Sequence, residues 1–204
     1  MMEASNKTQP SATAGRIEAA ALQVFYERGY SGASIRDISA RSGLATASLF
    51  HHFSSTEAIL ESILETAVDV LRVELDEALN GLTDPAQRVS TSVRVLVLSH
   101  CERIQQSFVA QSELRSLSGA ASDRVRSKRS GVQRTLDGAI LDGIASGQFN
   151  SENPRETSRA ILSMCTQVAT WYRPSGPLSP NEVSAIYIGL TLRMLGHGPG
   201  RDLA

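Results

Sequence analysis

The chain has 204 residues, of which 41% are hydrophobic and 20% charged, and its formal net charge is −1. This composition excludes a long disordered protein and leaves enough apolar residues for one or two folded domains. No apolar run reaches the roughly 18–20 residues of a membrane helix, and the polar beginning contains no signal-peptide stretch. We therefore expect a cytoplasmic protein with no membrane partner.

The chain begins with a polar, unpatterned stretch, residues 1–11, for which we expect a disordered arm. From Thr13 the apolar residues fall at helical spacing and form one stripe, and Gly29 ends that helix. The members of the stripe are Ile17, Ala20, Ala21, Val24 and Phe25. The pattern predicts an amphipathic first helix.

Two short helices follow, separated by a tight turn at Gly43. The hydroxyl of Ser34 can accept a hydrogen bond from the amide of Asp37, and the acidic side chain at that position completes a capping box. The second short helix is predicted from Thr46 to about His52. Residues 34–53 therefore have the sequence form of a helix-turn-helix, whose second helix enters the major groove of DNA.

The rest of the chain is also predicted to be helical. Ser54 and Glu57 form an S-x-x-E capping box for a long helix whose apolar period lasts until Gly81. Further helices are expected at about 102–117 and 123–146, and after the pairs Asp84–Pro85, Asn153–Pro154 and Ser179–Pro180. No alternation typical of strands is present, so the predicted fold is all-α with about nine helices.

This pattern predicts a three-helix DNA-binding domain over residues 12–54, a helical domain over 55–197 and a tail over 198–204. In the DNA-facing helix, Leu49 and Phe53 are four residues apart and are expected to face the core. The opposite surface then exposes small and polar side chains. Ser34 and Thr46 stand at helix N-termini, where free amides favour phosphate oxygens.

Residues 16–60 resemble the DNA-binding domain of the TetR family of transcriptional repressors. The resemblance is carried by Arg16-Ile17, Ala20-Ala21-Leu22, Phe25, Arg28-Gly29-Tyr30, Ser34-Ile35-Arg36-Asp37-Ile38, Gly43-Leu44, Leu49-Phe50-His51-His52-Phe53 and Glu57-Ala58-Ile59-Leu60. It implies a ligand-responsive repressor that binds palindromic operator DNA as a homodimer. It also implies an effector pocket and the dimer interface in the C-terminal domain, and no cofactor.

Two positions depart from the family pattern. Phe50 stands where the family usually has tyrosine, and Thr56 stands where a lysine usually precedes the glutamate. A phenolic hydroxyl and a positive charge are therefore missing, which weakens phosphate contacts rather than base reading. The candidate DNA-contacting residues are Ser34, Arg36, Thr46, Ala47, Ser48, Phe50, His51 and His52.

Other functions are less consistent with the sequence. His51 and His52 are adjacent on a helix, point about 100° apart and have no partner at i, i+4, so no metal site is expected. No phosphate-binding loop, nucleophile elbow, zinc-protease motif or dinucleotide fingerprint is present, so we expect no enzyme. The alternative is a helical ligand-binding or protein-interaction module without DNA binding, supported only by Phe50 and Thr56.

The C-terminal domain carries weaker signals for an effector. Residues 141–149 and 171–179 resemble segments of TetR-type regulators of fatty-acid or steroid catabolism, some of which respond to acyl-CoA esters. The basic run 124–134 is either a solvated face or an anion site for coenzyme A phosphates, and Trp171 either packs a bundle end or lines an apolar pocket. The candidate effector-binding residues are Val97, Phe108, Arg124, Arg126, Arg129 and Trp171. A plain apolar effector is the alternative.

The last two predicted helices, about 154–171 and 180–195, carry more apolar residues than a monomer usually exposes. Pairing both with a second copy forms a four-helix bundle with two-fold symmetry. The candidate interface residues are Ile161, Met164, Val168, Ile186, Tyr187, Leu190 and Met194. Cys101 and Cys165 lie far apart in apolar-periodic segments, so we expect two buried thiols rather than a disulfide or a zinc site.

Overall fold

The computed structural model describes residues 12–197, which contain ten α-helices and one 3-10 helix but no strand. The elements in chain order are α1 (Ala12–Arg28), α2 (Ile35–Ser42), α3 (Thr46–His52), α4 (Thr56–Leu79), α5 (Pro85–Glu102), α6 (Ile104–Ser112), η1 (Leu114–Ser116), α7 (Gly119–Ala145), α8 (Pro154–Thr166), α9 (Val168–Trp171) and α10 (Pro180–Met194). The predicted all-α class is confirmed. The predicted arm, 1–11, and tail, 198–204, lie outside the described residues.

Side-chain caps fix the predicted starts of three helices. The hydroxyl of Ser34 accepts a hydrogen bond from the amide of Asp37 at 3.2 Å, and the Asp37 carboxylate accepts one from the Ser34 amide at 3.0 Å. Ser179 and Glu182 form the same reciprocal pair at the start of α10, and the Asp84 side chain caps α5. Each cap satisfies amides that have no partner inside the helix, which is why the three predictions are confirmed.

The predicted cap of α4 is wrong. Ser55, not Ser54, accepts the hydrogen bond from the amide of Ala58 at 3.0 Å. The carboxylate of Glu57 instead accepts hydrogen bonds from the backbone amide and the hydroxyl of Ser118, at 2.8 and 2.9 Å. Glu57 thereby joins the start of α4 to the start of α7, a tertiary contact that the local spacing does not reveal.

Other helix boundaries also differ from the prediction. α7 begins at Gly119 rather than near residue 123, because the alanines after Gly119 are strong helix formers. The helix predicted over 154–171 is divided at Gln167 into α8 and α9, and the stretch 102–117 is divided into the end of α5, α6 and η1. These helices are therefore more numerous and shorter than expected.

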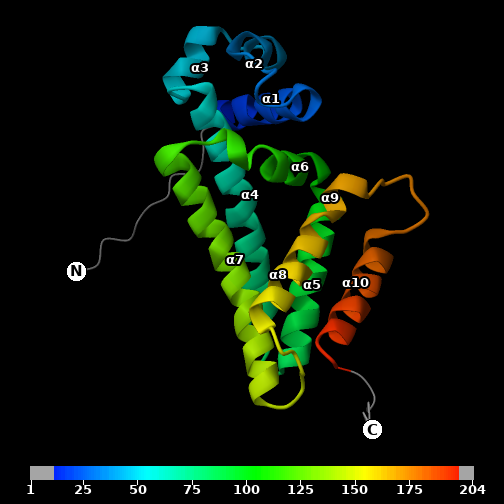
Figure 1. The fold of residues 1–204 in the computed structure, drawn as a ribbon. Helices are drawn as coiled ribbons and strands as arrows, with labels where there is room; N and C mark the ends of the chain where they lie inside the picture. Colours follow the sequence, from blue (N-terminus) through cyan, green and yellow to red (C-terminus); the bar gives the residue numbers. More distant parts are fainter. Residues whose placement is uncertain (1–11, 198–204) are drawn as a thin grey trace.

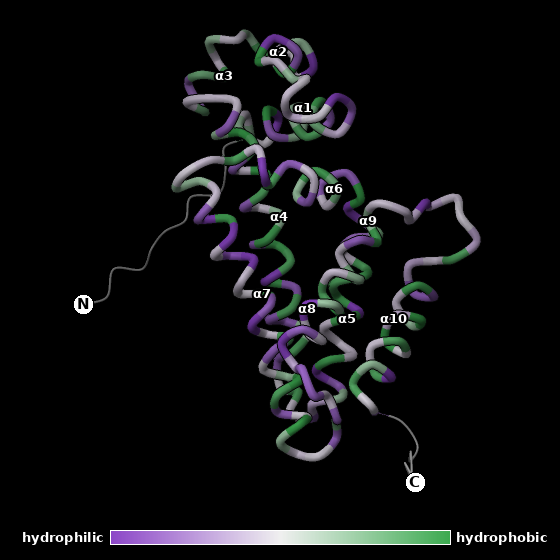
Figure 2. The backbone as a smooth tube through the Cα atoms, in the orientation of Figure 1, coloured by the Kyte–Doolittle hydropathy of each residue, from purple (hydrophilic) through white to green (hydrophobic). Residues whose placement is uncertain are grey.

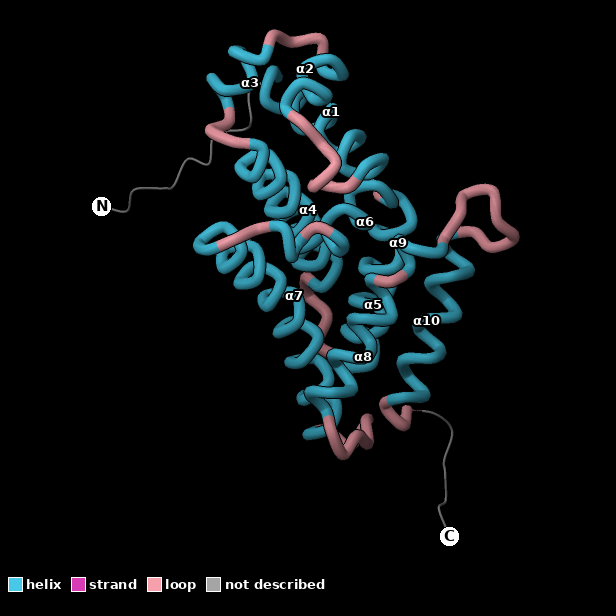
Figure 3. The backbone as a smooth tube through the Cα atoms, turned by 45° about the horizontal axis from the view of Figure 1, so that its top comes forward, coloured by secondary structure: helices cyan, strands magenta, loops and turns pink. Residues whose placement is uncertain are grey.

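The helices α1, α2 and α3 form a compact group at one end of the molecule, and α4 leads from this group into the body (Figure 1). In the body, α5 packs against α4, α7, α8 and α10, and α10 lies on the side of α5 away from α7 (Figure 1, Figure 3). The short α6 lies between α1 and the body and contacts both α1 and α4. We call α1–α3 the helix-turn-helix domain and the remainder the body.

Two hydrophobic cores hold these parts together, and hydrophobic and hydrophilic positions alternate along the helices around them (Figure 2). The N-terminal core includes Phe25, Ile38 and Leu49 from α1, α2 and α3, but also Leu60 from α4 and Val109 from α6. The C-terminal core gathers buried residues of α4, α5, α7, α8 and α10. Burying one such side chain stabilises the fold by about 1.5–3 kcal/mol. The buried Val109 therefore holds α6 against the helix-turn-helix domain.

Cys101 and Cys165 are both buried in the C-terminal core, as predicted. Burial raises the pKa of the Cys101 thiol to about 11 and that of the Cys165 thiol to about 12. Both side chains therefore remain protonated thiols that fill apolar space. Among the described residues no helix is both long and apolar enough to cross a membrane.

Candidate nucleic-acid interface and ligand cavity

Helix α3 buries one face and exposes the other. Leu49 is 0% exposed and Phe53 packs against the same N-terminal core, as the four-residue spacing predicted. On the opposite face Ala47, His51 and His52 are exposed, and Phe50 has 52% of its surface exposed. The face therefore offers a methyl group, an aromatic ring and two imidazoles to a partner.

The hydroxyl groups at the helix starts are already engaged within the protein. Ser34 Oγ donates a hydrogen bond to the Asp37 carboxylate at 2.5 Å, and Thr46 Oγ1 donates one to Ser39 Oγ at 3.4 Å. Ser48 is half-buried. The Ser34 side chain therefore serves as a helix cap, and both its hydroxyl and its backbone amide are hydrogen-bonded to Asp37.

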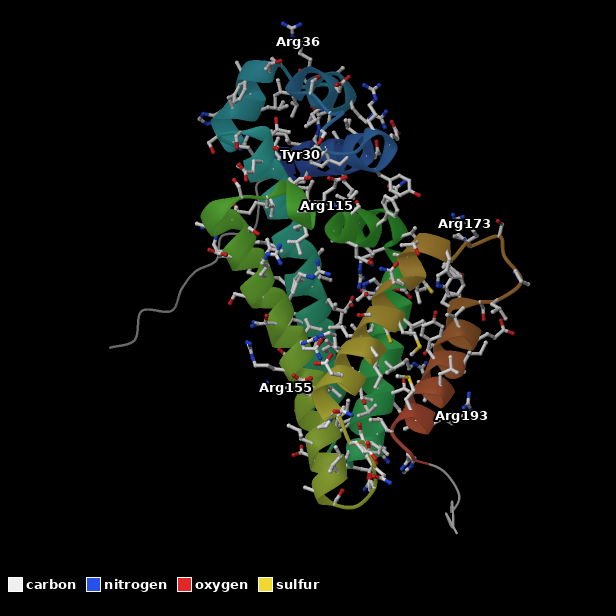
Figure 4. The ribbon with its side chains drawn as sticks, viewed as in Figure 1. Tyr30, Arg36, Arg115, Arg155, Arg173 and Arg193 are labelled. Atoms are coloured by element: carbon white, nitrogen blue, oxygen red, sulfur yellow. The ribbon has the colours of Figure 1, made fainter. Side chains whose placement is uncertain are left out.

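One arginine of the helix-turn-helix domain has no partner in the part of the chain that the structure describes. Arg36 is exposed, and Figure 4 shows it projecting from α2 away from the body. The other arginines of this domain are held in the pairs Arg28–Asp37 at 2.7 Å, Arg41–Glu27 at 2.5 and 2.7 Å, and Arg16–Ser42 carbonyl at 2.9 Å. Arg36 is therefore the free positive charge beside the exposed face of α3.

The rings of His51 and His52 lie edge to face, with centroids 5.4 Å apart. The two ring nitrogens of an imidazole can form hydrogen bonds, so both side chains can contact bases or phosphates. Within residues 12–197 no group of three or more histidine, cysteine, aspartate or glutamate side chains could hold a metal ion.

A cavity of about 260 Å³ lies inside the body, between α4, α5, α6, α7 and α8. Its apolar wall includes Leu64, Val68, Leu71, Val125, Val132 and Leu162. This volume is slightly below the usual range for ligand pockets in proteins, which is about 300–1,000 Å³. The cavity can therefore enclose a short apolar chain.

Three arginines line this cavity, and two of them are neutralised. Arg103 bonds to Glu74 at 2.5 Å, and Arg159 bonds to Glu156 at 2.8 Å. Arg129 has no carboxylate partner among the described residues, and burial lowers the pKa of its guanidinium. A largely buried cation without a counter-ion is costly in a protein interior, so an anion or a strong acceptor in the cavity is favoured next to it.

Two hydrogen bonds orient the polar groups of the cavity. Arg129 Nη1 donates to the carbonyl oxygen of Ala110 at 3.3 Å. His100 is buried, and its Nδ1 lies 2.6 Å from the carbonyl oxygen of Leu96. Sequence reasoning missed His100, because a histidine one turn after a core leucine looks like any other residue of an amphipathic helix.

The predicted apolar pocket residues do not line the cavity. Val97 is fully buried in the C-terminal core. Phe108 packs edge to face on Tyr26 of α1, with ring centroids 5.4 Å apart. Trp171 is exposed and stacks on Tyr187 at 6.4 Å. Each side chain is directed by its helix into another contact.

Of the predicted basic pocket residues, only Arg129 lines the cavity. Arg124 is paired with Glu61, and the neighbouring Lys128 is paired with acidic side chains of the same helix, α4. Arg126 is exposed and donates to Ser122 Oγ at 3.1 Å. The basic run is therefore neither a purely solvated face nor a single anion site.

Sequence families match both parts of the chain. The family described as "Bacterial regulatory proteins, tetR family" matches residues 17–63, and the one described as "Tetracyclin repressor-like, C-terminal domain" matches residues 82–195. The chain belongs to the TetR family. The TetR-family domain order, with a helix-turn-helix domain before a helical body, is the one that the structure shows.

Individual TetR-family proteins are similar along nearly the whole chain. The HTH-type transcriptional repressor KstR2 of Mycolicibacterium smegmatis is 27% identical over 193 residues, which cover 94% of each chain. The solved structure of a tetR-family regulatory protein from Rhodococcus RHA1 is 26% identical, with a TM-score of 0.89 over 93% of this chain and 100% of that one. AibR, solved with isovaleryl coenzyme A and operator DNA, shares the fold at 19% identity, with a TM-score of 0.82 over 91% of this chain and 100% of that one.

The TetR-family body exposes an apolar face on α10. Ile186, Leu190 and Met194 are spaced by four residues, and 47%, 38% and 44% of their surfaces are exposed. Tyr187 and Met164 are half-buried. The predicted interface residues Ile161 and Val168 are 0% exposed and belong to the C-terminal core, so the monomer itself uses them.

Proposed function

We propose that this chain is a ligand-responsive transcriptional repressor of the cytoplasm, which binds palindromic operator DNA as a homodimer and leaves it when an effector enters the cavity. The observation that carries the proposal is the helix-turn-helix domain, whose exposed α3 face and free Arg36 point away from a body that contains a cavity. Membership in the TetR family and the similarity to a transcriptional repressor over 94% of the chain support it.

In the proposed complex, α3 enters the major groove. Ala47, Phe50 and His51 lie on its exposed face and are the side chains placed to meet base edges, sugars and phosphates. Ser34, Thr46, Ser48 and His52 are proposed to contribute at the edges of that face. Arg36 contributes a phosphate contact, and such contacts make affinity depend on salt.

A homodimer is proposed to bring two α3 helices to half-sites about one helical turn apart, or a multiple of it. The exposed face of α10 supplies apolar surface for the interface, with Ile186, Leu190 and Met194 at its centre and Tyr187 and Met164 beside it. Helices α8 and α10 of each protomer would then form a four-helix bundle around a two-fold axis.

An acyl-CoA thioester is the proposed effector. The cavity has room for a short acyl group, while the nucleotide part must lie outside it. Arg126 is exposed and lies three residues before Arg129 on α7, on the same side of that helix, so we propose that it meets a phosphate of the nucleotide. AibR, which shares the fold, has been solved with isovaleryl coenzyme A and operator DNA, and this supports the proposal.

The proposal is tested by fluorescence anisotropy of labelled operator DNA, measured across salt concentrations and then titrated with octanoyl-CoA, octanoate and free coenzyme A. We expect salt-dependent binding and release by octanoyl-CoA. Binding to no DNA sequence at any salt concentration would leave the helical ligand-binding module as the function. Release of DNA by coenzyme A alone would contradict the assignment of the acyl group to the cavity.

Arg126→Ala separates the two parts of an acyl-CoA. Because Arg126 lies outside the cavity, the variant should weaken release by octanoyl-CoA and leave release by octanoate unchanged. Equal effects on the two ligands would show that Arg126 does not meet the nucleotide. Arg134→Ala, at an exposed arginine of the same helix that does not line the cavity, is the control.

A further inference from the structure

Four ionisable side chains line the cavity, and only two of them have an acidic partner among the described residues. Arg103 and Arg159 are each bonded to a glutamate. His100 and Arg129 stand apart, because neither has an acidic partner in the described part of the chain. Both groups line the same cavity.

The hydrogen bond of His100 fixes its tautomer. A backbone carbonyl oxygen only accepts, so Nδ1, 2.6 Å from the Leu96 oxygen, must carry a hydrogen and donate it. Burial is the main cause that lowers the pKa of the ring, and the charges of Arg129 and Arg103 act in the same direction, while the hydrogen bond to Leu96 acts against them. The imidazole is therefore neutral, and Nε2 is an acceptor with no hydrogen-bond partner among residues 12–197.

Arg129 has the opposite requirement. A guanidinium has five N–H donors and no acceptor, and only Nη1 has a partner here, the Ala110 carbonyl at 3.3 Å. The remaining donors have no acceptor among the described residues and are open to a ligand in the cavity. The same cavity thus presents unused donors and one unused acceptor, together with an apolar wall.

We propose that the effector is a hydroxyacyl compound, whose carbonyl or carboxylate oxygen accepts from Arg129 and whose nearby hydroxyl donates to Nε2 of His100. Its apolar chain then lies against Leu71 and Val132. A hydroxy acid and its coenzyme A thioester share this chemistry, and the experiment separates them. The inference rests on the proposed function, because it specifies the effector of the same cavity.

The unpaired Nε2 provides the selectivity. An acyl group without a hydroxyl would displace water from Nε2 and leave it without a hydrogen-bond donor. The free-energy cost of leaving this acceptor unpaired exceeds the net stabilisation that one hydrogen bond gives. Sites built to bond a hydroxyl reject analogues that lack it far more strongly than apolar pockets reject a missing methylene. The cavity should therefore distinguish two acids that differ only in one hydroxyl group.

The test is isothermal titration calorimetry on the wild-type chain without DNA. The probes are octanoate with 2-hydroxyoctanoate and 3-hydroxyoctanoate, and octanoyl-CoA with 3-hydroxyoctanoyl-CoA. We expect at least one hydroxylated probe to bind at least fivefold more tightly than its parent, and the series in which this occurs identifies the acid or the thioester. A smaller ratio in both series, or no binding of any probe, overturns the proposal.

Two variants test which residues cause the preference for hydroxylated probes. His100→Leu should reduce the ratio to below twofold without weakening the parent probe, and Arg129→Gln should weaken both probes at least tenfold. Arg155→Gln is the matched control, because Arg155 is exposed on α8 and does not line the cavity (Figure 4). A ratio that survives in folded His100→Leu overturns the role of Nε2, and the wild-type comparison stands if that variant fails to fold.

Fluorescence anisotropy with operator DNA on the same preparations distinguishes failure of the effector proposal from failure of the proposed repressor function. A chain that binds DNA but shows no preference for hydroxylated probes overturns the effector assignment and leaves the repressor function in place. A chain that prefers hydroxylated probes but binds no DNA overturns the proposed function and retains the chemistry of the cavity.

Discussion

Arg129 on α7 donates a hydrogen bond to the Ala110 carbonyl on α6, so a residue of the cavity is bonded to the helix that packs against the helix-turn-helix domain. The same helix contributes Val109 to the N-terminal core, and its Phe108 contacts Tyr26 of α1. An effector oxygen that accepts from the other N–H groups of Arg129 acts on the side chain that makes this connection. We therefore expect occupation of the cavity to change the position of α1–α3 through α6.

Arg129→Met should stabilise the ligand-free protein. The guanidinium is largely buried and has no counter-ion among residues 12–197, and an apolar side chain of similar length removes the cost of burying it. The free energy of unfolding in urea should rise by about 1 kcal/mol, while DNA release by the effector is lost. Arg155→Met, at an exposed site, should change stability by less than about 0.5 kcal/mol. A lower free energy of unfolding for Arg129→Met would mean that the charge is compensated in the free protein.

Arg36→Ala should weaken operator binding and leave folding unchanged. Arg36 has no partner in the described residues, so its charge is free for a phosphate. The slope of log affinity against log salt should fall by about 1. Gln23→Ala, on exposed α1 surface, serves as the control for the measurement. An unchanged slope would remove Arg36 from the DNA contacts.

Phe50→Tyr should tighten operator binding. Phe50 is 52% exposed on the side of α3 that is proposed to face DNA, so an added hydroxyl reaches solvent or phosphate without repacking the core. One net hydrogen bond corresponds to up to about 1 kcal/mol, or roughly fivefold in affinity. Phe50→Leu, which lacks the hydroxyl, should not tighten binding. Equal affinities for wild type and Phe50→Tyr would show that the ring edge does not face a phosphate.

Leu190→Glu should produce a monomer in light scattering at micromolar concentration. The substitution places a charge in the middle of the exposed apolar face of α10, where desolvation in an interface is costly. Val73→Glu is the control, because Val73 is also an apolar residue with an exposed side chain, 51% against 38% for Leu190, but lies on α4. A dimer that survives Leu190→Glu would place the interface elsewhere, and loss of the dimer in Val73→Glu would point to α4.

Helix caps and glycine turns could be predicted from the sequence, because each depends only on residues that are neighbours along the chain. Examples are the caps at Ser34 and Ser179 and the turn at Gly43, where φ is +67°. The cavity depends instead on how helices meet. Lys128 and Arg129 are adjacent in the sequence, yet the first pairs with acidic residues of α4 while the second lines the cavity.

The same limit applies to the interface residues. Ile161 and Ile186 are both apolar residues on amphipathic helices, and sequence reasoning assigned both to a dimer interface. The structure buries Ile161 completely in the C-terminal core and leaves Ile186 exposed. Periodicity identifies an apolar stripe, but it does not say whether the monomer or a second copy covers that stripe.

Selection of bound sequences from a random pool of double-stranded DNA tests whether the chain is a dimeric, sequence-specific repressor. A dimeric repressor of this fold predicts enrichment of one palindromic motif, with half-sites about 10 base pairs apart or at a multiple of that spacing. The enriched DNA should be bound by the wild-type chain and more weakly by Arg36→Ala. If a folded, dimeric chain enriches no sequence after repeated rounds, it is not a sequence-specific repressor.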